Sequence, residues 1–155
     1  MKKFLFDCGT RDATASLGLL FLRVCTGLMM LLGHGIGKIE KYGAMKDGFP
    51  VPDFFPLKCM SPPISLMSTI GAEVGCSVLI IFGLATRPAA FIFAFTMTVA
   101  AFNIHGSNPW FTPGGIGLKE GPILYLIPVV AILLAGAGQY SFDAAILKEG
   151  RRKRW

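Results

Sequence analysis

Charged side chains are scarce in this sequence, and their scarcity excludes an ordinary water-soluble domain. Only 15% of the 155 residues are Asp, Glu, Lys or Arg, whereas 53% are hydrophobic. A soluble domain has about a quarter charged residues, so this chain could hardly cover itself with a water-facing surface. The mean hydropathy of +0.59 agrees. Both values predict a chain that faces lipid.

Closely spaced cysteines are also lacking. The four cysteines show neither a CxxC pair nor metal-ligand spacing: Cys8, Cys25, Cys59 and Cys76. A membrane thiol–disulfide oxidoreductase needs neighbouring thiols for exchange, so the sequence argues against that class. No metal site is predicted, and no haem, flavin or iron–sulfur motif is visible. No internal repeat is visible either, which makes a transporter built on an inverted repeat a poor fit.

The net charge of +6 is concentrated near the C-terminus. Five of the fifteen basic residues follow the last apolar segment: Lys148, Arg151, Arg152, Lys153 and Arg154. A basic cluster directly after a membrane segment is typical of a cytoplasmic topology signal and of contact with anionic lipid. We therefore predict membrane lipid, and no nucleic acid, as the partner of this tail.

Four apolar segments have the length and composition of membrane helices, for which about 20 residues suffice. They cover residues 17–36, 64–84, 89–104 and 122–137, and Pro128 predicts a kink in the last. The predicted fold class is all-α: a polytopic membrane protein forming an antiparallel four-transmembrane-helix bundle with two long outer loops.

The basic residues beside the spans predict the orientation. Nine lie on the side of the two termini and five on the other side, which favours cytoplasmic N- and C-termini. The predicted organisation is a cytoplasmic N-terminal segment (1–16), a four-helix membrane domain (17–143) and a basic cytoplasmic tail (144–155). The long outer loops, 38–63 and 103–121, are rich in Pro and aromatic residues. They fit functional lids or a collar on the membrane surface.

Two charged residues fall inside the apolar segments, Arg23 and Glu73. A charge at the bilayer centre costs about 2.5–3.5 kcal/mol and marks a functional site by default. The predicted depths allow an Arg23–Glu73 pair. Such a pair is either an interhelical clamp or part of a ligand site. Gly27, Gly71 and Gly75 are expected to let the helix backbones approach closely beside it.

Further polar residues converge at the outer end of the predicted bundle. His34 and Lys38 end the first helix, His105 ends the third, and Glu120 begins the fourth. Histidine changes protonation near neutral pH and can carry protons. Glu120 also suits the first turn of a helix. Together with Glu73, these residues predict a polar funnel.

The same residues carry a resemblance to the DoxX family. The first helix contains Arg23-x-x-x-Gly27 and then Gly33-His34-Gly35-x-x-Lys38, and the second contains Ala72-Glu73 and Gly83-Leu84-Ala85-Thr86-Arg87. His105, Glu120 and the run Gly136-x-Gly138-x-x-Ser141-x-Asp143 complete a pattern that covers residues 20–145.

The resemblance implies a four-helix bundle in the bacterial cytoplasmic (inner) membrane, similar to the membrane subunit of thiosulfate:quinone oxidoreductase. It implies quinone as the cofactor, with His34, Glu73, His105 and Glu120 as catalytic groups and Arg23 and Lys38 as cofactor-binding groups. Electrons would come from another membrane or peripheral redox subunit or from a small donor. The alternative is a non-catalytic accessory or anchoring subunit of a larger membrane complex, so whether the chain is an enzyme stays open.

Overall fold

The described part of the chain is entirely helical. The computed structural model describes residues 9–10, 12–111 and 119–152, and no strand occurs within them. Several basic residues that entered the orientation count lie outside these ranges: Lys2, Lys3, Arg11, Lys153 and Arg154. So does part of the second outer loop, residues 112–118. The all-α prediction is confirmed for the described residues.

Among the described residues, three helical rods are long and apolar enough to cross a membrane. Each consists of α-helix with one π-helical turn. They are α2 (Ala13–Met30), η1 (Leu31–Gly35) and α3 (Ile36–Glu40); α5 (Pro62–Ile70), η3 (Gly71–Cys76) and α6 (Ser77–Phe82); and α7 (Thr86–Val99) with η4 (Ala100–Ile104). The predicted apolar segments fall inside these rods to within a few residues at each end.

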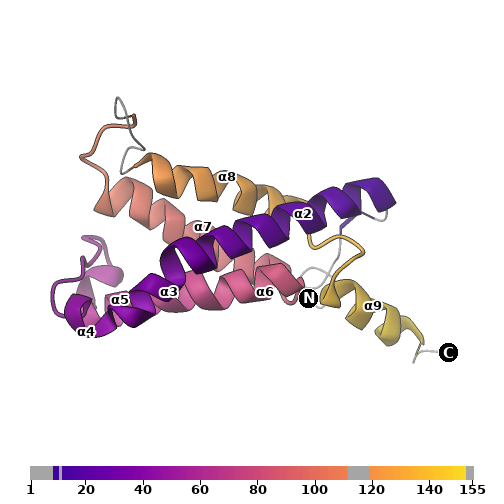
Figure 1. Cartoon of the computed structure of the whole chain (residues 1–155), viewed down its shortest axis with the longest axis horizontal. Helices are drawn as coiled ribbons and strands as arrows, with labels where there is room; N and C mark the ends of the chain where they lie inside the picture. Colours follow the sequence, from indigo (N-terminus) through magenta and orange to yellow (C-terminus); the bar gives the residue numbers. More distant parts are fainter. Residues whose placement is uncertain (1–8, 11, 112–118, 153–155) are drawn as a thin grey trace.

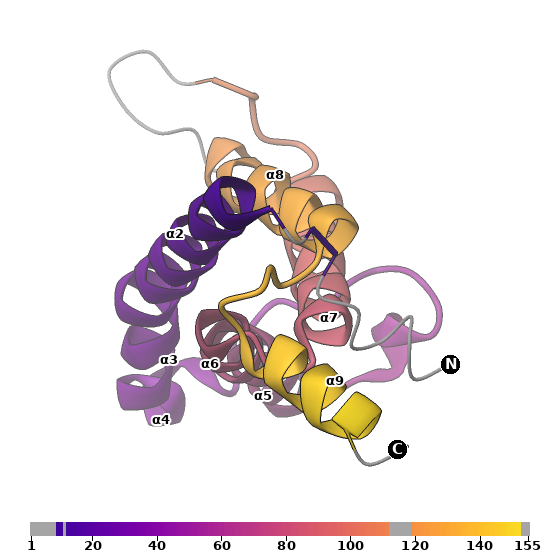
Figure 2. The ribbon, with the colours of Figure 1, turned by 90° about the vertical axis from the view of Figure 1, so that its right-hand side faces the viewer.

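A fourth, shorter apolar helix completes the packed helices. Helix α8 (Glu120–Ala135) has 16 residues, and Pro128 lies inside it without ending it. It packs along α7 and also contacts α2. The view along the helices shows α2, α6, α7 and α8 arranged around a common axis (Figure 2).

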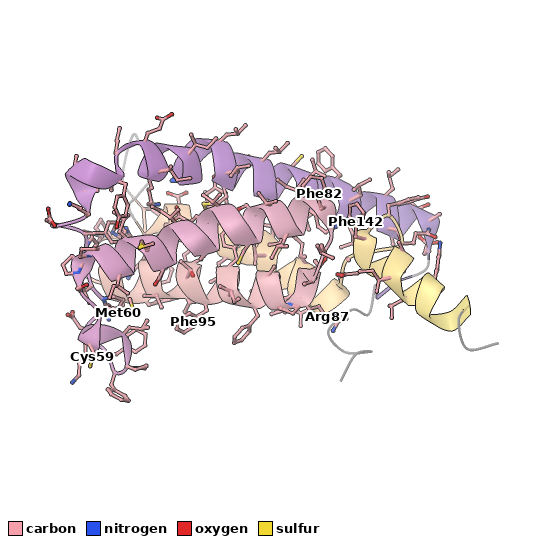
Figure 3. The ribbon with its side chains drawn as sticks, turned by 90° about the horizontal axis from the view of Figure 1, so that it is seen from below. Cys59, Met60, Phe82, Arg87, Phe95 and Phe142 are labelled. Carbon is pink, nitrogen blue, oxygen red and sulfur yellow. The ribbon has the colours of Figure 1, made fainter. Side chains whose placement is uncertain are left out.

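The two ends of these packed helices differ. At one end lie the start of α2, the α6–α7 turn and α9 (Phe142–Arg152); at the other lie α4 (Tyr42–Met45) and the 3₁₀ turn η2 (Leu57–Cys59) (Figure 1). Arg87 and Phe142 mark the first end and Cys59 the second (Figure 3). We call them the Arg87 end and the Cys59 end.

The core between the helices is small and apolar. Its buried members come from all four packed helices: Met30, Cys76, Ile80, Ala89, Ala90, Phe93, Ala94, Met97, Val129 and Ile132. Alanines on α7 allow the close packing of α7 on α8. Large apolar side chains cover the outside of the rods instead, among them Phe21 at 71% exposed and Leu134 at 73%. A continuous apolar exterior of this kind suits lipid rather than water.

Local sequence signals set the helix boundaries. Asp12 caps α2, because its Oδ1 accepts a hydrogen bond from the Ala15 amide at 2.7 Å. Pro62 and Pro63 open α5, where a missing N–H costs nothing. Gly83 ends α6 in a left-handed conformation, and a side chain there would collide with the guanidinium of Arg23.

The predicted basic tail contains a helix that the sequence analysis did not anticipate. Helix α9 begins at Phe142, and the Ala144 amide donates to Ser141 Oγ at 3.2 Å. The signal was present in the sequence, since Ser141 is a favoured N-cap residue and Asp143 an acid in the first turn.

Of the three glycines expected to let helix backbones approach closely, one does so. A Cβ on Gly27 would lie 3.0 Å from the Ser77 carbonyl oxygen, so two rods do meet closely there. Gly71 and Gly75 have no such neighbour within 4 Å, so neither brings two described backbones together. The prediction for these two glycines was wrong because they lie on a different face of their helix from the contact.

Candidate functional site

A cavity of about 470 Å³ lies among the helices at the Cys59 end. It is formed where the first and third rods finish and where α5 and α8 begin. The lining residues are Met30, His34, Lys38, Phe49, Pro50, Pro52, Ser65, Thr69, Glu73, Thr96, Met97, Val99, Ala100, Ile104, His105, Gly121, Pro122 and Tyr125. Apolar groups dominate this surface, and the polar groups are few. Both properties are typical of small-molecule sites.

The charged groups of the cavity form an ion pair. Lys38 Nζ donates to Glu73 Oε2 at 2.5 Å, and the two side chains are 20% and 6% exposed. Lys38 comes from α3, at the end of the first rod, and Glu73 from η3 in the second. A carboxylate in such an environment needs an opposite charge and hydrogen-bond donors. Lys38 is therefore the charged partner of Glu73, a role that the sequence analysis expected for Arg23.

Arg23 lies at the opposite end and does not line the cavity. It is fully buried; its Nη1 donates to the carbonyl oxygens of Ile80 at 3.0 Å and Ile81 at 3.3 Å, and its Nη2 to that of Tyr140 at 2.8 Å. The predicted Arg23–Glu73 pair is thus wrong. The close contact of Gly27 with Ser77 sets the register of the two rods, which places Arg23 level with Ile80. Ile80 lies seven residues, or roughly 10 Å, beyond Glu73 along the helix.

Both histidines reach the cavity. His34 lies in η1, and its ring meets the ring of Tyr125 edge-on, with centroids 5.4 Å apart and an interplanar angle of 89°. His105 directly follows η4, and its Nδ1 lies 3.3 Å from Asn108 Nδ2. Each residue can hold or pass a proton at the wall of the cavity.

Glu120 stands beside the cavity rather than on its wall. It is the first residue of α8, and the lining is formed by its neighbours Gly121 and Pro122. The structure therefore brings together Lys38, Glu73, His34 and His105, leaves Glu120 adjacent, and places Arg23 at the other end.

Two parts of the site were missed by the sequence analysis. Tyr125 is the only hydroxyl-bearing side chain in the last apolar segment, which was the available signal. The second part is the segment 49–53, here called the strap, whose Phe49, Pro50 and Pro52 line the cavity. Nothing in the sequence indicated which outer-loop residues would return to the helices.

The strap is attached to two helices. Ser65 Oγ of α5 donates to the Pro50 carbonyl oxygen at 2.8 Å, and the Asp53 amide donates to Asn103 Oδ1 of η4 at 3.0 Å. Since α5 and η4 do not pack extensively on each other among the described residues, the strap bridges them. The outer loop is thus part of the cavity wall.

The three π-helical turns found in the described part of the chain all lie at the cavity. His34 is in η1, Glu73 is in η3, and η4 ends directly before His105. A π turn adds a residue to the helical repeat and re-aims the side chains around it, and such turns are frequent at functional sites. Their coincidence at one level makes this cavity the candidate functional site of the fold.

Comparison with known proteins identifies a family match. The DoxX family model matches residues 18–106. Two Haemophilus influenzae proteins named as uncharacterised are similar. One is 32% identical over 133 residues, covering 84% of this chain and 92% of the relative. The other is 28% identical over 114 residues, covering 74% and 72%.

A Bacillus subtilis protein named "Putative oxidoreductase CatD" is 28% identical over 135 residues, covering 85% of this chain and 89% of that protein. No solved structure matches the chain at a comparable level.

Proposed function

The chain belongs to the DoxX family of membrane proteins, and we propose that it is a quinone-interacting subunit of a membrane oxidoreductase. The observation that supports this most directly is the Lys38–Glu73 ion pair inside a largely apolar cavity. The oxidoreductase name of the Bacillus relative agrees with redox chemistry. The proposed setting is the bacterial inner membrane, with both termini cytoplasmic.

The residues of the cavity fit a quinone. Its flat ring needs apolar walls, which Met30, Met97 and Ile104 offer, and the volume of about 470 Å³ lies within the usual range of about 300–1,000 Å³ for ligand pockets. Its two carbonyl oxygens need donors. Lys38 and Tyr125 supply N–H and O–H donors from different helices.

A bound quinone would supply a two-electron, two-proton redox couple. The Lys38 ammonium would orient one ligand oxygen by donating a hydrogen bond, and its charge would stabilise negative charge that develops there. Glu73, His34 and His105 would hold protons and exchange them with the outer surface. Because no haem or flavin motif is visible, electrons are assigned to a partner subunit or to a small donor.

The fourth membrane span is assigned to α8. Its 16 residues cover about 24 Å, less than the roughly 30 Å of a bilayer core. Local thinning of the bilayer accommodates such a difference at modest cost. This completes an antiparallel four-span bundle with the cavity near the outer surface.

The experiment compares quinone retention in matched carboxyl variants. The protein is gently extracted from membranes, examined by native mass spectrometry with parallel lipid extraction, and titrated with a short-chain benzoquinone. We expect quinone to co-purify with the wild type and with Glu40→Gln, whose exposed carboxylate lies outside the cavity. Glu73→Gln should lose it and bind the benzoquinone about tenfold more weakly or worse, because Lys38 then loses the carboxylate that orients it towards the ligand, and a hydrogen bond to a charged group is worth about 1.5–3 kcal/mol.

An accessory or anchoring subunit is the second candidate function. It is favoured by α9, where Phe142 is 55% and Ile146 46% exposed beside the basic Lys148. This surface suits docking of another subunit. Recovery of a stoichiometric larger complex without quinone, unchanged by Glu73→Gln, would select this function over quinone binding.

A further inference from the structure

Two π-helical turns touch through a single glycine. A Cβ placed on Gly35, the last residue of η1, would lie 2.7 Å from Val74 Cγ2 and 3.8 Å from the carbonyl carbon of Glu73. Real Cβ atoms essentially never come within 3.0 Å of another heavy atom. The Val74 side chain can pack against the backbone at this point only because residue 35 has no side chain.

This contact lies at the base of the ion pair. Val74 directly follows Glu73, and Gly35 precedes Lys38 by three residues, or about one helical turn. The separation of η1 and η3 at Gly35 therefore contributes to the distance between Lys38 Nζ and Glu73 Oε2. Neighbouring glycines do not share this role. Gly33 has only the Tyr125 hydroxyl at 4.0 Å, and Gly37 has nothing within 4 Å.

We propose that Gly35 is a positioning residue, which holds Lys38 and Glu73 at ion-pair distance so that both act on the same ligand group. The inference rests on the proposed quinone site for its functional consequence. Its structural part concerns the ion pair alone. Alanine is the better helix former, so a glycine buried inside the rod is explained by the contact with Val74.

The contact predicts a compensating pair of substitutions. Gly35→Ala adds a methyl group that must displace Val74 or separate the rods, which would lengthen the Lys38–Glu73 distance. Val74→Ala removes Cγ2, the atom that this methyl group would meet. The double variant Gly35→Ala/Val74→Ala should therefore restore the spacing.

The experiment uses the full chain in detergent and compares Gly35→Ala, Val74→Ala, the double variant and the control Gly37→Ala. The first readout is the infrared stretching band of the Glu73 carboxylate, assigned by difference with Glu73→Gln, which reports its hydrogen-bond partner. The second is the dissociation constant for a short-chain benzoquinone. Thermal unfolding is followed as a third readout.

Gly35→Ala should shift the carboxylate band and weaken benzoquinone binding about tenfold, the cost of losing one hydrogen bond from a displaced Lys38 to the ligand. The double variant should return both readouts towards wild type, whereas Gly37→Ala and Val74→Ala should change neither. If Gly35→Ala does not fold, recovery of folding, band and binding in the double variant supports the proposal.

An unshifted band in Gly35→Ala, or a double variant no better than the single, would overturn the positioning role. Absence of benzoquinone binding in every variant would instead refute the proposed function, while the carboxylate band still decides the positioning role.

Discussion

Arg23 illustrates how a buried cation can be held mainly by backbone carbonyl oxygens: it makes three such hydrogen bonds, its Nε has no partner among the described residues, and the charge of Asp143 acts on it from nearby. The Ile80 carbonyl oxygen accepts from the Gly83 amide at 3.1 Å and from Arg23 as well, and the connection after α8 adds the Tyr140 carbonyl oxygen. A guanidinium has five N–H donors in a fixed fork, and Arg23 directs three hydrogen bonds to these oxygens. One side chain thus joins the first rod, the second rod and the segment before α9.

Replacing Arg23 should lower stability and leave ligand affinity alone. Arg23→Met keeps the apolar stem but removes three buried hydrogen bonds to carbonyl oxygens, and we expect the free energy of unfolding to fall by about 3 kcal/mol. Denaturant unfolding in detergent measures this. Quinone affinity per folded molecule should match wild type, since Arg23 does not line the cavity. If Arg23→Met were as stable as wild type but no longer bound quinone, Arg23 would be part of the ligand site.

Asp143 provides the second connection at the Arg87 end. Its Oδ1 and Oδ2 accept hydrogen bonds from the amides of Ala85 and Thr86 at 2.8 and 2.9 Å, at the start of α7. Asp143→Ala removes both and should cost about 1–2 kcal/mol. Asp143→Asn keeps one acceptor oxygen and should cost less. Equal thermal unfolding of wild type and Asp143→Ala would exclude this capping role.

Among the elements, the strap provides the clearest kinetic prediction. Ser65→Ala and Asn103→Ala each remove one of its two attachments to the helices, worth about 1 kcal/mol each. We expect the short-chain benzoquinone to dissociate several-fold faster from each variant, measured by stopped-flow mixing. Thr98→Ala is the matched control, because Thr98 bonds only within its own helix, to the Ala94 carbonyl oxygen. If the benzoquinone dissociated at the same rate from all three variants as from wild type, the two attachments of the strap would not control ligand release.

The rods were predictable from sequence because hydrophobic length is a property of the chain alone. Their relative register was not. Depths counted from the start of each apolar segment placed Arg23 and Glu73 at a similar level in the membrane. In the register fixed by the Gly27–Ser77 contact, Arg23 instead lies about 10 Å further along the axis than Glu73. The convergence of His34, Lys38, Glu73 and His105 could be predicted from the shared membrane surface. The π turns could not, since they depend on packing between rods.

For the whole molecule, Cys59 tests the proposed orientation. It is an exposed free thiol at the Cys59 end, whereas Cys25 is partly and Cys76 almost fully buried. In a variant that keeps only Cys59, a membrane-impermeant maleimide added to intact spheroplasts should label the protein. A variant keeping only Cys76 should be labelled only after denaturation. If Cys59 were labelled only after the membrane is permeabilised, the Cys59 end would lie on the cytoplasmic side, and the proposed orientation would be wrong.

The contrast between the two ends implies an uneven local stability along the axis of the molecule. Buried hydrogen bonds from Arg23 and Asp143 connect the elements of the Arg87 end, whereas the described residues of the Cys59 end surround a cavity of about 470 Å³. Partial opening should therefore begin at the Cys59 end, as low-stability regions open first. Amide hydrogens of α5 should exchange faster than those of α6, although both belong to one rod. A ligand could then bind and dissociate through local opening at the Cys59 end while the helices stay packed at the Arg87 end.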